Sequence, residues 1–124
     1  MNISGKVFKR DCYILIMELK DKKCDCSTKN VQKLTLEGIE ELLKEVKDWK
    51  VVNGHRLTKE YKFKDYLSGV QFVNQLATIA EEQNHHPEIY LGWRKVKVEI
   101  YTHAVKGLSD NDFILAAKYD ALQK

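Results

Sequence analysis

The chain has 124 residues, 44% hydrophobic and 31% charged, a composition that predicts one domain large enough to bury its own core. Its 21 basic and 18 acidic residues are spread along the chain and give a net charge of +3, which argues against a dedicated nucleic-acid surface. The longest apolar run, residues 12–17, is far shorter than the roughly 20 residues that a membrane-spanning helix needs. We therefore expect a soluble protein with neither a membrane nor a nucleic-acid partner.

The cysteines Cys12, Cys24 and Cys26 are odd in number and sparse for a disulfide framework, which favours a reducing, cytoplasmic compartment. Cys24 and Cys26 form a C-x-C pair that is able to bind metal. No nearby Cys or His completes the four ligands of a structural zinc site, so we interpret both as ordinary thiols.

Residues 1–33 are predicted to form an N-terminal extension, and residues 34–124 the main domain. A short run over residues 13–19, apolar and rich in β-forming side chains, predicts a strand that pairs with residues 7–8 or joins a sheet edge. Residues 20–33 are predicted to be a loop.

Two amphipathic helices are predicted in the first part of the main domain. The first covers residues 36–47 after the N-cap Thr35, and its apolar residues recur at i, i+3, i+4 and i+7. They are Ile39, Leu42, Leu43 and Val46. The second begins after Asp65 and ends near Asn84, because Pro87 disfavours helical geometry at the residue before it. Its predicted apolar stripe consists of Val70, Val73, Ala77 and Ala80, widened by Phe72, Leu76 and Ile79.

A β-hairpin is predicted between these helices. Its strands cover residues 49–52 and 57–63 and flank Asn53 and Gly54, a pair suited to the positive φ angles of a tight turn. His55, beside the turn, is expected to be a solvated loop residue.

Two further strands, over residues 89–91 and 96–103, precede a third helix. The second of them alternates, so that Val96, Val98, Ile100 and Thr102 share one face and Lys97, Glu99, Tyr101 and His103 the other. His103 therefore lies off the core face. Ser109 and Asp112 form a capping box before a helix that carries Ile114, Ala117 and Ala121.

The element order α-β-β-α-β-β-α favours an α+β fold. We expect three helices to cover one face of a four-stranded antiparallel sheet, with the N-terminal β extension added to it. The other face of the sheet then meets solvent, a ligand or another subunit.

Three of the four histidines form the most informative feature of the sequence. His85 and His86 are followed by Pro87, and His103 leaves the non-core face of a strand. One histidine at a helix end often does no more than favour the helix dipole. Three together indicate proton transfer or metal binding, because imidazole titrates near neutral pH. Adjacent ligands diverge and the i, i+4 zinc pair of a helix is absent, so acid/base chemistry fits better than a zinc site.

The histidines belong to a longer set of spaced residues, which comprises Glu81, His85, His86, Pro87, Trp93, His103 and Asp112. Supporting features are Trp49 after the first helix, residues 63–66 before the second, and residues 107–109 before the third. This set resembles the signature of the pterin-4a-carbinolamine dehydratases. The resemblance covers about residues 34–120 and leaves the N-terminal extension uncovered.

The resemblance implies an activity: dehydration of the 4a-hydroxytetrahydropterin left by aromatic amino-acid hydroxylases, which gives the quinonoid dihydropterin and supports tetrahydrobiopterin recycling. No metal and no organic cofactor is implied. Loss of water needs one proton delivered to the departing hydroxyl and another taken from the neighbouring ring nitrogen, and imidazoles can do both. By resemblance, His86 and His103 act as acids on the two faces of the pterin, and His85 acts as the base.

Other residues receive roles by the same resemblance, each beside a plainer explanation. Glu81 orients His85 or is a solvated carboxylate at the helix end. Trp93 walls the pterin pocket or packs in the core or an interface. Asp112 assists catalysis or serves only in the capping box. The remaining predicted pocket residues are His85, His86, Pro87, Thr102, His103, Ala104 and Val105.

Two positions depart from the family pattern. Asn84 stands where relatives are often acidic, and Ile89 stands where an aromatic residue often follows the proline and glutamate. Neither change removes a proposed proton carrier. We expect them to affect pocket shape and substrate preference, because a lost ring weakens stacking with a flat ligand.

A non-catalytic interaction protein is the competing hypothesis. Some relatives are dimerisation partners of transcription factors, and others assist the assembly of enzymes. The resemblance implies a homodimer or homotetramer, a functional link to an aromatic amino-acid hydroxylase, and a cytoplasmic location, with a nuclear one left open. The three histidines together favour an enzyme, since a scaffold has no need of them.

Overall fold

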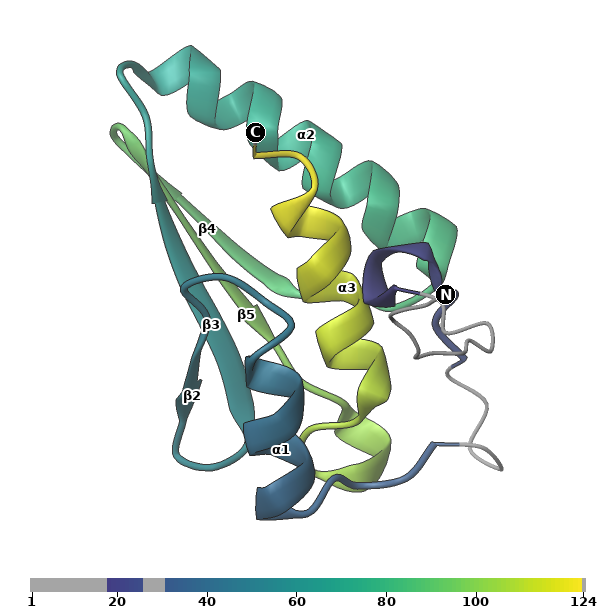
Figure 1. The fold of residues 1–124 in the computed structure, drawn as a ribbon. Helices are drawn as coiled ribbons and strands as arrows, with labels where there is room; N and C mark the ends of the chain where they lie inside the picture. The colour runs from purple at the N-terminus through teal and green to yellow at the C-terminus, as the bar shows by residue number, and fades with distance from the viewer. Residues whose placement is uncertain (1–17, 26–30, 124) are drawn as a thin grey trace, which may run out of the picture.

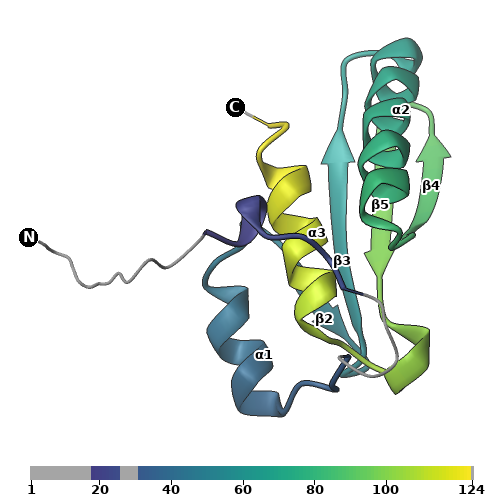
Figure 2. The same ribbon diagram turned by 90° about the vertical axis from the view of Figure 1, so that its right-hand side faces the viewer.

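Four antiparallel strands form one sheet in the order β2-β3-β5-β4, and the helices lie on one side of it (Figures 1 and 2). This computed structural model describes residues 18–25 and 31–123. The elements are η1 (Leu19–Asp21), α1 (Leu36–Leu43), β2 (Lys50–Val52), β3 (Arg56–Lys62), α2 (Tyr66–Gln83), β4 (Glu88–Gly92), β5 (Lys95–Ile100), η2 (His103–Val105) and α3 (Asp110–Asp120). The predicted α+β architecture is confirmed.

The described part of the N-terminal extension packs against α3, on the side away from the sheet (Figure 1). Most of the strand predicted over residues 13–19 lies outside the described residues. At its end, Leu19 begins the 3-10 turn η1 instead of continuing a strand. Lys118 Nζ donates to the carbonyl of Lys20 at 2.7 Å, which ties η1 to α3.

Helix α1 ends at Leu43, earlier than the predicted residue 47. The Thr35 side chain caps it as predicted, by accepting a hydrogen bond from Gly38 N. At the other end, Lys47 N donates to Asp120 Oδ2 at 2.8 Å, so α3 binds the backbone that would otherwise continue the helix. Asp48 then takes a left-handed φ of 63°, which turns the chain into β2.

The β2–β3 turn has the predicted geometry, because Asn53 and Gly54 have φ angles of 55° and 73°. His55, at the end of this turn, is half-buried, and its Nδ1 lies 2.9 Å from the carbonyl oxygen of Asn53. In β5 the predicted core face is confirmed, and Val96, Val98, Ile100 and Thr102 are all buried. His103 is exposed as expected, but β5 ends before it and His103 begins η2.

Helix α2 begins and ends as predicted. Asp65 caps it by accepting from Ser68 N at 2.8 Å, and this hydrogen bond lowers the pKa of the carboxyl. Asn84, with φ 51°, ends it in the left-handed conformation. The predicted stripe is confirmed at Phe72, Leu76 and Ala80, which are buried together with Gly69. Val73 and Ile79 are partly buried against the core. Ala77 is exposed, so the prediction is wrong at this position.

Helix α3 is the central element of the helical layer, and most of its residues are buried. Tyr119 donates its hydroxyl to the carbonyl of Leu76 at 3.0 Å, which joins α3 to α2. Burial raises the pKa of the Tyr119 hydroxyl. Asp112, in the first turn, is fully buried. None of the helices in the described part of the chain has the length and apolar character needed to cross a bilayer.

Candidate active site

His85 is buried at the point where α2 ends, with 7% of its surface exposed. The left-handed Asn84 turns the chain there, and His85 N still bonds the carbonyl of Ala80 at 3.1 Å. The His85 ring therefore points inward, where its Nε2 lies 2.6 Å from Asp112 Oδ1.

Asp112 connects three elements. Its Oδ2 accepts hydrogen bonds from Ser109 N and Thr102 Oγ1, each at 2.8 Å, and its Oδ1 bonds His85. The capping box predicted from Ser109 and Asp112 is present. The two explanations considered for this residue are therefore compatible, because one carboxylate caps α3 and also holds the His85 ring.

His86 has a different partner. Its Nε2 lies 2.6 Å from Glu81 Oε1, and both side chains are exposed. Glu81 therefore lies against His86 and not His85, and its exposure agrees with the alternative expectation of a solvated carboxylate at the helix end. The left-handed Asn84 directs His85 inward to Asp112 and leaves His86 beside the last turn of α2.

His103 lies on the exposed side of the molecule, in η2. Its Nε2 is 2.8 Å from the hydroxyl of Tyr101, and the two rings are 4.4 Å apart at 60°. The guanidinium of Arg56 lies over the Tyr101 ring, 4.4 Å from its centre.

The three histidines gather at one end of the sheet. Glu88, at the start of β4, pairs with Glu99 near the end of β5, so the residues just before β4 and just after β5 are close together. Thr102 also links His103 to His85. It directly precedes His103, and its hydroxyl donates to the Asp112 carboxylate, which bonds the His85 ring. Pro87, Ala104 and Val105 lie at the same end.

Trp93 lies at the other end of the same hairpin, in the turn where Gly92 pairs with Lys95, and 76% of its surface is exposed. Its role in walling the pterin pocket stays a prediction that the geometry of a single chain does not support. Tyr101 and Arg56 were not predicted as site residues. The alternation predicted over residues 96–103 puts Tyr101 on the same face as His103, which was the available signal.

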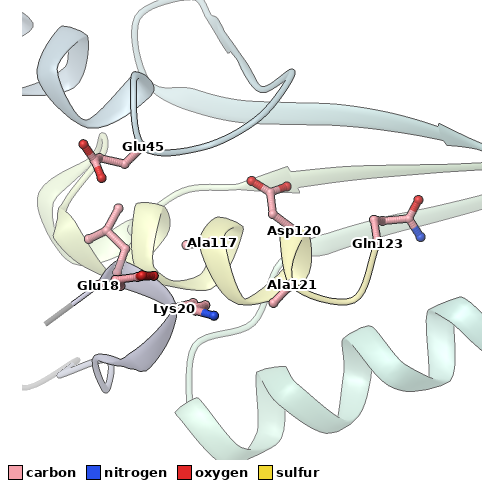
Figure 3. A pocket seen from close by; sticks show the side chains of 8 residues that line it. Glu18, Lys20, Glu45, Ala117, Asp120, Ala121 and Gln123 are labelled. Carbon is pink, nitrogen blue, oxygen red and sulfur yellow. The ribbon is translucent and has the colours of Figure 1, made fainter.

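One cavity opens beside the site, and a second lies away from the histidines. One of about 470 Å³ is lined by His103 and Tyr101, but not by His85 or His86. Another, of about 590 Å³, lies between η1 and the end of α3, and Figure 3 shows Glu18, Glu45 and Asp120 around it. The Asp120 carboxylate already accepts from Trp49 Nε1 and Lys59 Nζ, each at 2.9 Å, so its position has a structural explanation.

Within residues 18–25 and 31–123, no group of three or more His, Cys, Asp or Glu side chains is arranged to hold a metal ion. Cys24 is buried, and its Sγ lies 3.6 Å from the carbonyl oxygen of Asn111. Cys26, the second member of the C-x-C pair, lies outside the described residues.

Comparison with known proteins identifies the family. A family model described as pterin 4 alpha carbinolamine dehydratase matches residues 32–122. The chain belongs to this dehydratase family. It is 40% identical over 113 residues to the mitochondrial pterin-4-alpha-carbinolamine dehydratase 2 of Arabidopsis thaliana. That match covers 87% of this chain and 60% of the plant protein.

Two solved structures extend the comparison of the dehydratase fold. A transcriptional coactivator/pterin dehydratase from Brucella melitensis is 32% identical, with a TM-score of 0.71, and the match covers 75% of this chain and all of that one. A pterin dehydratase-like protein described as a RuBisCO assembly factor in the alpha-carboxysome is 27% identical, with a TM-score of 0.53. That match covers 61% of this chain and 89% of the other. Membership of the family supports a pterin dehydratase activity in general.

Proposed function

We propose that this protein dehydrates 4a-hydroxytetrahydropterin to quinonoid dihydropterin by histidine acid/base catalysis. The bond between C4a and the hydroxyl oxygen breaks, and a proton delivered to that oxygen lets it leave as water. The proton on N5 is removed, and a double bond forms between C4a and N5. Atoms and electrons balance without an oxidant or a reductant, so the reaction needs no redox cofactor.

The observation that carries this proposal is the gathering of three imidazoles at one end of the sheet, each held by its own hydrogen-bond partner. His86 and His103 are exposed and serve as the acids toward the hydroxyl. His85 serves as the base. Asp112 is a positioning residue, because a buried carboxylate on Nε2 fixes the ring and stabilises the imidazolium that forms when His85 takes a proton.

The hydrogen-bond partners of the two acids are also positioning residues. Glu81 holds His86 and Tyr101 holds His103, so each ring is oriented before a substrate arrives. Pro87 and residues 102–105 line the pterin pocket in this proposal. In the cell, the reaction follows an aromatic amino-acid hydroxylase, whose 4a-hydroxylated product must lose water before reduction restores the cofactor.

A kinetic experiment tests this function. The carbinolamine is generated in place by an aromatic amino-acid hydroxylase, and its ultraviolet decay is followed with wild-type protein, His86→Ala and the control Gln75→Ala. Gln75 is an exposed residue of α2 away from the histidines. We expect acceleration by the wild type and by Gln75→Ala that His86→Ala largely loses. No acceleration by folded wild-type protein would refute the proposal.

An interaction role is the second candidate, favoured by the two structural neighbours and by exposed apolar side chains. β4 is an edge strand that carries Tyr90 and Leu91, and Leu67 of α2 is 70% exposed. We propose that these surfaces support a homodimer or homotetramer, and that partner proteins, a transcription factor among them, use the same surfaces. Light scattering after size-exclusion chromatography tests the first part, and a monomer at micromolar concentration would contradict it.

A further inference from the structure

The cavity beside His103 has an unusual charge. Five of its lining side chains are basic, namely Lys33, His55, Arg56, His103 and Lys106, and none is acidic. Its volume of about 470 Å³ is within the range of small-molecule sites, roughly 300–1,000 Å³. A cavity lined by one sign of charge raises the local concentration of ligands of the opposite sign.

The positive charge of Arg56 is already paired with a carboxylate. Its guanidinium pairs with Glu99 at 3.1 Å and stacks on Tyr101, so Arg56 has a structural explanation. Lys33 and Lys106 differ, because within the described residues neither ammonium group lies in an ion pair with a carboxylate. The excess positive charge of the cavity therefore comes from these two lysines, together with whichever histidines are protonated.

The fold holds both lysines beside η2. Leu34 N donates to the carbonyl of Leu108 at 2.8 Å, which places Lys33 alongside Gly107. A side-chain carbon at position 107 would lie 2.8 Å from Cε of Lys33, so the glycine makes room for the lysine stem. Lys106 has a left-handed φ of 52°, and its N–H bonds the carbonyl of His103 at 3.1 Å.

The proposed reaction does not require these two cations. Water loss from the pterin ring needs proton carriers, and those are the three histidines. Lys33, Lys106 and His103 line the same cavity, so a pterin that His103 contacts there lies in a cavity that both ammonium groups also line. Ammonium groups without a carboxylate partner bind phosphate or carboxylate groups as point charges.

We infer that the substrate of this protein is a pterin whose side chain carries an oxyanion, a phosphate or a carboxylate, and that Lys33 and Lys106 bind that group. The inference rests on the proposed function and specifies its substrate class. The lysines would attract a phosphate and a carboxylate in the same way, and the experiment distinguishes the two groups.

Fluorescence titration with two matched ligand pairs tests the inference. One pair is 7,8-dihydroneopterin and its 3′-monophosphate, and the other is 6-hydroxymethylpterin and pterin-6-carboxylate. We expect the wild type to bind the anionic member of at least one pair about tenfold more tightly at low salt, a preference that falls as salt is added. The pair with the larger preference identifies phosphate or carboxylate as the group that is bound.

Two double variants show whether the lysines cause the preference. Lys33→Met with Lys106→Met should bind both members of each pair about equally, with unchanged affinity for the neutral member. Lys62→Met with Lys64→Met removes the same charge at the other end of the sheet and should keep the preference. Equal binding of both members by the wild type, or a preference that survives in the first double variant, overturns the inference.

The carbinolamine assay separates this inference from the proposed function. Dehydration of an uncharged pterin carbinolamine by a wild type without anion preference refutes the inference alone. Absence of both dehydration and pterin binding refutes the inference and the proposed function together.

Discussion

Asp112 is fully buried and receives three hydrogen bonds, of which only the one from Ser109 N belongs to the helix cap. In Asp112→Asn, the amide oxygen is able to keep the bonds from Ser109 and Thr102, but the NH₂ group then faces Nε2 of His85. The ring loses its acceptor and the imidazolium loses its counter-charge. We expect dehydration to slow at least about a hundredfold, because a triad histidine with the wrong tautomer loses at least that much.

Stability separates this effect from simple unfolding. The exchange leaves buried groups imperfectly paired, so the free energy of unfolding should fall by about 1–3 kcal/mol, and the protein should remain folded at 25 °C. Asp110→Asn is the matched control, because Asp110 is exposed in the same helical turn. A wild-type rate in folded Asp112→Asn would show that the pair with His85 is only structural.

His103 differs from the buried Asp112, because it is exposed. Among the described residues, the only ring that it contacts is that of Tyr101. His103→Ala should therefore change the free energy of unfolding by less than about 0.5 kcal/mol, while carbinolamine dehydration falls by about 10²-fold or more. Urea unfolding and the decay assay on one preparation measure both. A large loss of stability with unchanged turnover would contradict this role.

At the scale of elements, the end of α2 determines where two of the histidines point. Asn84 has a φ of 51°, which an alanine adopts at a cost of about 1–2 kcal/mol and a glycine adopts freely. Asn84→Ala should therefore lower the free energy of unfolding by about 1 kcal/mol and reduce dehydration, whereas Asn84→Gly should leave both close to wild type. Equal behaviour of the two variants would show that the left-handed turn does not position His85 and His86.

Helix starts could be predicted from the sequence, because their determinants are local. Thr35, Asp65 and Ser109 each cap a helix through atoms within three residues. The early end of α1 could not be predicted, since it depends on a hydrogen bond from Lys47 to Asp120, far along the chain. The existence of each helix followed from periodicity and its start from a local cap, whereas the end of α1 followed from a tertiary contact.

The same distinction applies to the candidate site. The three histidines stood out by residue type and spacing, but their partners depended on the fold. Glu81 was expected beside His85 because both lie near one helix end. The left-handed turn at Asn84 instead places His86 within hydrogen-bond distance of Glu81. The contact between His85 and Asp112 joins residues 27 positions apart, and spacing alone does not reveal it.

At the scale of the whole molecule, the segment of residues 18–25 reaches across the helical layer to the back of the candidate site. Cys24 N donates to Gln83 Oε1 at 2.8 Å, two residues before His85. Asn111, next to Asp112, exchanges two hydrogen bonds with the backbone of Asp25, at 2.9 and 2.7 Å. The segment therefore contacts residues close to both members of the buried pair of His85 and Asp112, on the side away from the sheet.

Asn111→Ala removes both hydrogen bonds to Asp25 and leaves that backbone without these partners. We expect the free energy of unfolding to fall by about 1–3 kcal/mol. Amide hydrogen exchange over residues 18–25 should become faster, because the segment loses two of its tertiary anchors. Dehydration should fall severalfold, since a looser support reduces the precision with which Asp112 holds His85. Asn74→Ala, at an exposed position of α2, is the control that should change none of the three. Unchanged exchange over residues 18–25 in Asn111→Ala would show that other contacts hold the segment, and that its hydrogen bonds to Asn111 do not support the site.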